Sequence, residues 1–266
     1  MKESRSPSLS IFANFFIDND ERLQRMKDSF RSFHNVDAVE WVINIRGKYK
    51  LGAGEYLHAE LGKKLYLSYL NSGLGWLHVS KKISKKITAD YVLFWIEDHI
   101  LLAQPQILNK CIYEMNQFNV DILYYSWYIQ SLMDLYKIIE PYGAGKYITA
   151  RKIDSNATIK IIDKLKERKP ILSIPKDDFY IISASSIIKK DFFKKVLLSK
   201  KPYLKRRPRK TPHDFEKRSK DNFASIIRTA WPVQEIFVCI DDDLGKTGYS
   251  LISRGLYPDR ISRKLL

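Results

Sequence analysis

An uninterrupted apolar run followed directly by two acids and a histidine is the feature that most restricts how this chain can fold. A strand is expected over residues 90–96 of the stretch ADYVLFWIEDHILL, and Glu97, Asp98 and His99 follow it at once. A strand that is apolar on both faces is typical of a parallel sheet covered by helices. Buried carboxylates are costly unless they are paired. We therefore expect either a metal or phosphate site at the carboxyl end of this strand or a strand that ends at the surface.

Strand and helix patterns alternate through the first hundred residues. Strands are expected over residues 9–18, 38–47 and 90–96, and helices over residues 21–33, 55–70 and 75–88. Asp20 is placed to cap the first helix, and Gly52 and Gly54 are expected to break the chain before the second. This order predicts an α/β fold with a parallel core.

The second half of the chain has a less regular pattern. Helices are expected over residues 106–116, from about residue 190, and over about 215–231. Strands are expected over residues 120–128, 179–185 and 235–241. Between them, residues 129–170 give a mixed signal, and EPYGAGKY within them is typical of a turn.

The composition is that of a globular protein large enough for one domain. Of its 266 residues, 45% are hydrophobic and 29% are charged. No apolar run approaches the roughly 20 residues that span a bilayer, and residues 1–10 lack the apolar core of a signal peptide. Cys111 and Cys239 form no C-x-x-C pair, which fits a reducing compartment. We expect a cytoplasmic location.

The formal net charge of +16 favours an anionic partner, such as nucleic acid, acidic lipid or a phosphorylated substrate. The densest basic run is KKPYLKRRPRK, residues 200–210, in which Pro202 and Pro208 favour an exposed loop. That loop is either solvated or anion-binding. Basic and apolar residues also alternate in the C-terminal RGLYPDRISRKLL, a pattern compatible with peripheral contact with an anionic membrane surface.

Four segments resemble GT-A type nucleotide-sugar glycosyltransferases, in particular the family 2 enzymes. SIFANFFIDNDERLQRMKDSF resembles the opening strand and helix, whose loop contacts the nucleotide. NSGLGWLHVSKKISKKITADYVLFWIEDH resembles the stretch that leads to the D-x-D motif, here Glu97-Asp98-His99. DDFYIISASSIIKKDFF resembles the acceptor-side strand, and TPHDFEKRSKD lies where the fold often supplies its catalytic carboxylate.

The resemblance implies a single-domain, GT-A-like, Rossmann-type mixed sheet flanked by helices. It places this domain over residues 9–250, between a flexible tail (residues 1–8) and a basic tail (residues 251–266). It implies transfer of a sugar from a nucleotide-sugar donor to a polysaccharide, lipopolysaccharide or lipid-linked acceptor, with inversion at the anomeric carbon. The residues to which it assigns donor binding are Asp18, Asn19, Arg46, Asn71 and Lys82. Family 2 enzymes usually carry an aspartate for the uracil ring where this chain has Arg46.

The D-x-D equivalent is expected to act on the donor's diphosphate. Carboxylate oxygens suit a divalent cation such as Mg²⁺ or Mn²⁺, and Mn²⁺ also accepts imidazole. The resemblance therefore makes Glu97, Asp98 and His99 candidate metal ligands, with Asp98 as the first candidate for a metal or ribose contact. The alternative is a surface strand end with a capped turn.

An inverting transfer also needs a general base for the acceptor hydroxyl. Asp214 and Glu216 in PHDFEK are the candidates, although acids after a proline are equally typical of a helix N-terminus. Two other functions stay open. The net charge favours a nucleic-acid-binding protein, against which no recognised nucleic-acid motif is present, and the same acids would suit a nucleotidyltransferase.

Overall fold

The computed structural model describes residues 5–70, 76–124, 137–168, 185–198, 226–241 and 250–258. Its first four parallel strands are β1 (Leu9–Phe16), β2 (Glu40–Arg46), β3 (Leu65–Tyr69) and β4 (Tyr91–Trp95). The other strands are β5 (His99–Leu101), β6 (Ile122–Leu123), β7 (Pro141–Ala144), β8 (Ile148–Ile153), β9 (Ile187–Lys189), β10 (Ile227–Pro232) and β11 (Phe237–Cys239).

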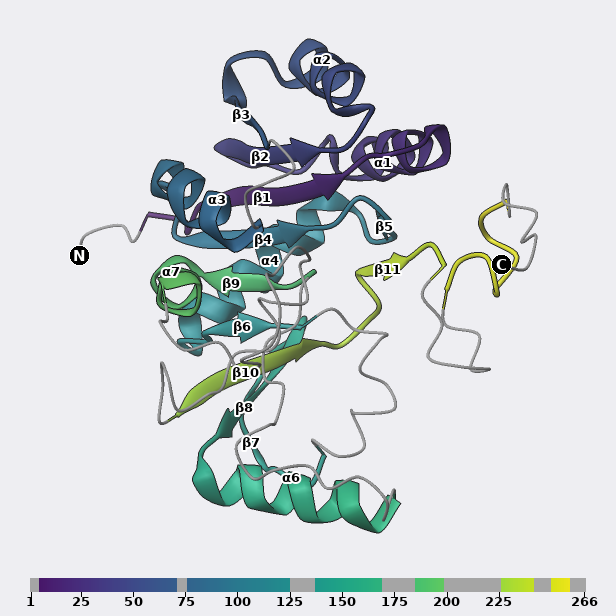
Figure 1. Cartoon of the computed structure of the whole chain (residues 1–266). Helices are drawn as coiled ribbons and strands as arrows, with labels where there is room; N and C mark the ends of the chain where they lie inside the picture. Colours follow the sequence, from purple (N-terminus) through teal and green to yellow (C-terminus); the bar gives the residue numbers. More distant parts are fainter. Residues whose placement is uncertain are drawn as a thin grey trace.

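Nine of these strands form one mixed sheet in the order β3-β2-β1-β4-β9-β6-β10-β8-β7 (Figure 1). The strands β3, β2, β1 and β4 are parallel neighbours, whereas β9 runs antiparallel to both β4 and β6. A separate two-stranded ribbon joins β11 to β5. The expectation of a mixed, mainly parallel α/β sheet in a single domain is confirmed.

Helices cover both faces of this sheet. The α-helices are α1 (Asp20–Phe33), α2 (Lys50–Leu61), α3 (Trp76–Ile83), α4 (Pro105–Gln117), α6 (Ser155–Arg168) and α7 (Lys190–Leu198), with 3-10 turns at Gly62–Lys64 and Ser84–Lys86. Side chains of α1, α2 and α4 share one core cluster with alternate residues of β1, β2 and β4. The opposite residues of those strands pack with α3, α6 and α7. None of the described helices is long and apolar enough to cross a bilayer.

The start of α1 differs from the expected cap by one residue. Asn19, not Asp20, has the extended backbone of an N-cap, and its side-chain oxygen accepts a hydrogen bond from the backbone N–H of Arg22 at 2.9 Å. Asp20 is instead the first residue of the helix, and its carboxylate accepts a hydrogen bond from the hydroxyl of Tyr49 at 3.0 Å. Both residue types satisfy the free N–H groups of a helix start, so the sequence alone did not separate them.

The expected helix over residues 55–70 is wrong in its second half. The helix α2 begins at Lys50, runs through Gly52 and Gly54, and ends at Leu61, and β3 follows it as an edge strand. Gly54 leaves room inside the helix for Tyr69 of β3, because a Cβ there would lie 2.1 Å from the tyrosine hydroxyl oxygen. Tertiary packing overrides the local preference of glycine here.

Two other expectations fail in the second half. Residues 227–231, expected at the end of a helix, belong to β10, because Ile227, Ala230 and Trp231 are buried in a strand between β6 and β8. The turn expected at EPYGAGKY is in part the edge strand β7, and α6 follows in a region that gave a mixed signal. The rest of the expected helix over residues 215–231 lies outside the described residues.

The described C-terminal segment packs against the ribbon. Leu251 is buried against Val238 and Ile240, and its N–H donates to the carbonyl of Cys239. The hydroxyl of Tyr257 donates to Asp28 of α1 at 2.6 Å. The first residues of the expected basic tail are therefore attached to the fold. The domain boundaries themselves stay a prediction.

Gly47 closes the turn at the carboxyl end of β2. Its φ of +104° is a conformation that side chains rarely adopt, and a Cβ would lie 2.2 Å from the carbonyl oxygen of Ile17. The backbone carbonyl of the neighbouring Arg46 accepts a hydrogen bond from the N–H of Ile17 at 2.8 Å. Gly47 thus allows the ends of β1 and β2 to approach closely.

Replacing Gly47 and Gly52 by alanine should have opposite effects on stability. We expect Gly47→Ala to lower the free energy of unfolding by about 2 kcal/mol or more, because it adds strain and a backbone clash. Gly52→Ala should leave stability unchanged or raise it by up to about 1 kcal/mol, because Gly52 is helical and a Cβ there meets nothing within 4 Å. Urea unfolding followed by circular dichroism measures both. Equal effects of the two substitutions would contradict this account of Gly47.

Candidate functional site

The carboxyl ends of β1, β2 and β4 bring several predicted residues to one edge of the sheet. Asp18 follows β1, Arg46 ends β2, and Glu97 lies two residues after β4. Parallel pairing places Phe16 opposite Arg46 and Ala13 opposite Trp95, so these three strand ends are neighbours. Ligands of α/β sheets bind at such an edge.

A hydrogen-bonded chain attaches the segment after β4 to α1. The indole N–H of Trp95 donates to the hydroxyl of Ser29 at 2.8 Å, and this hydroxyl donates to the backbone carbonyl of His99. One turn further along α1, the hydroxyl of Ser32 accepts from the N–H of Leu101 at 2.9 Å. All but Ser32 are buried at these contacts. The backbone on either side of Asp98 is therefore held by helix α1.

Glu97 lies half-buried among the strand ends. Burial, and next to it the charge of Asp98, raises the pKa of Glu97 to about 7. A hydrogen bond from the Phe16 backbone and the charge of Arg22 only partly offset this rise. Glu97 thus differs sharply from an ordinary surface glutamate.

Asp98 has the opposite environment. Its carboxylate contacts the imidazole Nδ1 of His99 at 2.7 Å. Burial alone would raise the pKa of Asp98, but the hydrogen bond and charge of His99, assisted by Arg25, hold this pKa below its ordinary value. Two adjacent acids are thereby pushed apart in pKa, which is common where carboxylates take different roles.

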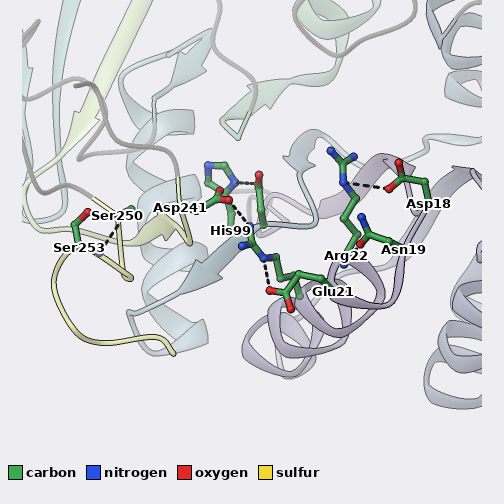
Figure 2. A network of polar contacts seen from close by, with 10 residues as sticks. Asp18, Asn19, Glu21, Arg22, His99, Asp241, Ser250 and Ser253 are labelled. Carbon is green, nitrogen blue, oxygen red and sulfur yellow. Dashed lines mark hydrogen bonds and ion pairs between the residues drawn. The ribbon is translucent and has the colours of Figure 1, made fainter. Parts of the chain in front are cut away.

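Arg25 connects Asp98 to the segment that follows the β5–β11 ribbon. Its guanidinium donates to Glu21 at 2.9 Å and to Asp241, which lies two residues after the end of β11. The backbone N–H of Ile240 in turn donates to the carbonyl of Asp98 at 2.7 Å. Figure 2 shows Asp241, His99 and Glu21 gathered in one polar group, with Arg22 and Asp18 beside it.

Two arginines lie beside one exposed aromatic ring at the strand ends. The guanidinium carbons of Arg46 and Arg22 lie 4.8 and 5.3 Å from the ring centre of Phe16. Arg22 also pairs with Asp18 at 3.3 Å and donates to the backbone carbonyl of Phe16 at 3.1 Å. Burial lowers the pKa of Arg46, Glu97 raises it, and the charge of Arg22 lowers it further.

The structure gathers most, but not all, of the sequence-predicted residues. Asp18, Arg46, Glu97, Asp98 and His99 lie around the strand ends, and Asn19 is there as the cap of α1. Lys82 is exposed in the last turn of α3, a helix that leads to the amino end of β4, away from this edge. Asn71, Asp214 and Glu216 lie outside the described residues. The roles of all these residues stay predictions.

Sequence reasoning missed Phe16, Arg22, Arg25 and Ser29. Arg22 and Arg25 look like ordinary surface positions of an amphipathic helix, yet Arg25 is only 6% exposed. A signal was present in the close spacing of Arg22 to the predicted donor loop at Asp18 and Asn19. Nothing in the sequence indicated the contact between Arg25 and Asp241, which are 216 positions apart.

The predicted metal ligands face different partners. Asp98 and His99 bond to each other, with Arg25 as the nearest cation of Asp98, whereas Glu97 accepts from the Phe16 backbone near Arg22. Across the described ranges, no group of three or more His, Cys, Asp or Glu side chains is arranged to hold a metal ion. This donor set, as arranged, does not fit the divalent cation that the fold family implies. The metal site stays a prediction.

Comparison with known proteins identifies the fold. No protein-family model matches the chain, and no curated protein matches it significantly. The crystal structure of S. aureus TarS 1-349 in complex with UDP-GlcNAc matches with a TM-score of 0.52 at 12% identity, over 89% of this chain and 59% of that one. TarS is a GT-A-type glycosyltransferase. The fold is GT-A-like.

Other TarS structures match in the same way. TarS 1-349 without UDP-GlcNAc gives a TM-score of 0.50 at 14% identity, over 86% of this chain and 59% of that one. The longer S. aureus TarS structure gives the same TM-score and identity, and there the match covers 36% of its chain. The present chain therefore corresponds to only part of the proteins that it matches. At this identity, the likeness concerns the fold.

The raised pKa of Glu97 predicts a pH-dependent gain in stability when its charge is removed. The unfolded chain releases this proton near the ordinary value of 4.5 and the folded protein only near 7, so folding loses stability as the pH rises through this window. Because Glu97 is only half-buried, we expect Glu97→Gln to gain about 1 to 2 kcal/mol in free energy of unfolding relative to wild type between about pH 5 and about pH 8.

Urea unfolding in EDTA across this pH range measures the effect. Glu55→Gln is the matched control, because Glu55 is exposed on α2. Its difference from wild type should not change with pH. A Glu97→Gln difference that is equally independent of pH would contradict the assigned pKa.

Proposed function

We propose that this protein is a glycosyltransferase that moves a sugar from a nucleotide-sugar donor to a saccharide or lipid-linked acceptor with inversion. The observation that carries the proposal is the meeting of Asp18, Arg46 and Glu97-Asp98 at the carboxyl edge of a GT-A-like sheet. A nucleotide-sugar donor agrees with the UDP-GlcNAc complex of TarS, a protein of similar fold.

The described residues supply groups for the nucleotide part of such a donor. Asp98 keeps its charge in the folded protein and is fixed by His99, so its carboxylate suits the ribose hydroxyls. Asp18 and Asn19 lie in the loop between β1 and α1, where they would contact the nucleotide. Arg46 supplies positive charge at the same edge.

Transfer requires that the acceptor hydroxyl attack the anomeric carbon while the nucleoside diphosphate leaves. The attacking hydroxyl must lose a proton, and we assign this role to Asp214 or Glu216 on the resemblance alone. The departing diphosphate gains negative charge, which cationic groups at the strand ends stabilise. Polysaccharide, lipopolysaccharide and lipid-linked sugars remain the acceptor classes of this proposal, and the excess positive charge suits acceptors near anionic lipid.

A nucleotide screen followed by a product assay tests the proposal. UDP, GDP, ADP and CDP and their glucose or N-acetylglucosamine derivatives are added with and without Mn²⁺. We expect one nucleotide to raise the Tm by several degrees, since a ligand at about 100 times its Kd adds about 2.7 kcal/mol. Incubation of the matching nucleotide sugar with candidate acceptors should release a nucleoside diphosphate. Release of pyrophosphate from a nucleoside triphosphate would instead indicate nucleotidyl transfer.

Asp98→Asn should lower kcat/KM about tenfold to 100-fold, because it removes a charge-assisted hydrogen bond to the donor. Asp37→Asn is the matched control, since Asp37 is exposed before β2, at the opposite edge of the sheet. Circular dichroism confirms that both variants fold. Full transfer activity of Asp98→Asn, or tight and salt-sensitive binding of generic DNA without nucleotide binding, would contradict the proposal.

A further inference from the structure

The two arginines on Phe16 form an unusual cationic pair. Both guanidinium groups lie within 5.3 Å of the centre of the same ring, and all three side chains are partly exposed. The charge of Arg22 is close enough to lower the pKa of Arg46. Two like charges beside one ring repel each other, and an anion bound next to both would relieve that repulsion.

The local contacts hold the pair in place. Asp18 and the Phe16 carbonyl accept from Arg22, and the ring of Phe16 offers its face to both guanidinium groups. Gly47 and the hydrogen bond between Ile17 and Arg46 fix the backbone beneath Arg46. Two of the described acids lie near the pair: Asp18, which is paired with Arg22, and Glu97, which accepts from the backbone. Planar guanidinium groups held in this way match the oxygens of a phosphate better than a flexible lysine would.

We propose that Arg22 and Arg46 clamp the diphosphate of the donor and of the leaving nucleotide, in the place where the fold family uses a divalent cation. This inference rests on the proposed glycosyl transfer. It follows from two observations together: the acids of the D-x-D equivalent are directed to separate partners, and the cationic pair stands at the neighbouring strand ends. The positive charge that neutralises the diphosphate then comes from side chains. The bond between the anomeric carbon and the diphosphate oxygen breaks with its electron pair on that oxygen, beside the two guanidinium groups.

Calorimetric titration of the full chain tests the clamp. UDP, GDP, ADP and CDP are each titrated in excess EDTA and, separately, in excess MnCl₂. We expect at least one of them to bind in EDTA, with a Kd that Mn²⁺ changes by less than about threefold. Its affinity should fall with increasing salt.

Substitutions locate the contact. Arg22→Gln and Arg46→Gln should each weaken nucleoside diphosphate binding about tenfold to 100-fold. The affinity for the matching nucleoside monophosphate should fall far less, so the preference for the diphosphate is lost. Arg31→Gln is the matched control, because Arg31 is on the same helix and 63% exposed, and its described contacts are with Asp28 and Tyr56. Arg46→Lys serves as a second variant if Arg46→Gln unfolds, and it should restore part of the affinity.

Each outcome separates the clamp from the proposed function. Binding that requires Mn²⁺, or an equal loss of diphosphate and monophosphate affinity in the arginine variants, overturns the clamp and leaves glycosyl transfer standing. No binding of any of the four nucleotides in either buffer overturns both. Binding in EDTA that depends on the two arginines supports the clamp.

Discussion

The hydrogen bond from Trp95 to Ser29 is the contact on which the candidate site depends. Trp95 ends β4, and its ring packs edge-on against Phe15 of β1 at 4.7 Å and Trp41 of β2 at 5.5 Å, so it is fixed by side chains of two other strands of the sheet. Its N–H orients the hydroxyl that holds the carbonyl of His99. A buried indole N–H needs a partner, and here this need links the aromatic core to the acidic segment. The position of Asp98 is thereby set by core packing, although Asp98 itself is polar.

The alignment of the strand ends depends in turn on the register of β1 and β2. Asn14 and Asn44 are paired in this register and buried, and the amide of Asn44 donates to Asn14 at 3.0 Å. Asn14 donates to Ser80 of α3, also at 3.0 Å. A shift of one residue would turn these amides into the opposite apolar face, so the polar chain favours a single register. That register is what brings Phe16 beside Arg46.

The sequence was sufficient for those parts of the fold in which local pattern and tertiary packing agree. The strands β1, β2 and β4 and the helices α1 and α4 combine clear periodicity with a matching environment, so their positions were predicted to within a few residues. The strand β3 was missed because Leu65–Tyr69 continues a helical pattern and is extended only through pairing with β2. The strand β10 was missed for a similar reason, because its environment is supplied by β6 and β8, far away in the sequence.

The same distinction applies to the candidate site. Glu97, Asp98 and His99 were visible because polar residues directly after an apolar strand are unusual, and Arg46 because it replaces an acid in a recognised pattern. The link from Arg25 to Asp241 required the folded chain, as did the sharing of Phe16 by Arg22 and Arg46. The charges of the motif differ most between sequence and structure.

In the sequence alone, Glu97-Asp98 indicates two negative charges that could bind a cation. In the fold, burial favours the neutral form of Glu97, Asp98 is balanced by His99 and Arg25, and the positive charge lies on the arginines at the adjoining strand ends. An edge of this kind attracts a diphosphate more readily than an edge with two uncompensated acids, because its acidic groups already have partners and two guanidinium groups lie beside the same ring.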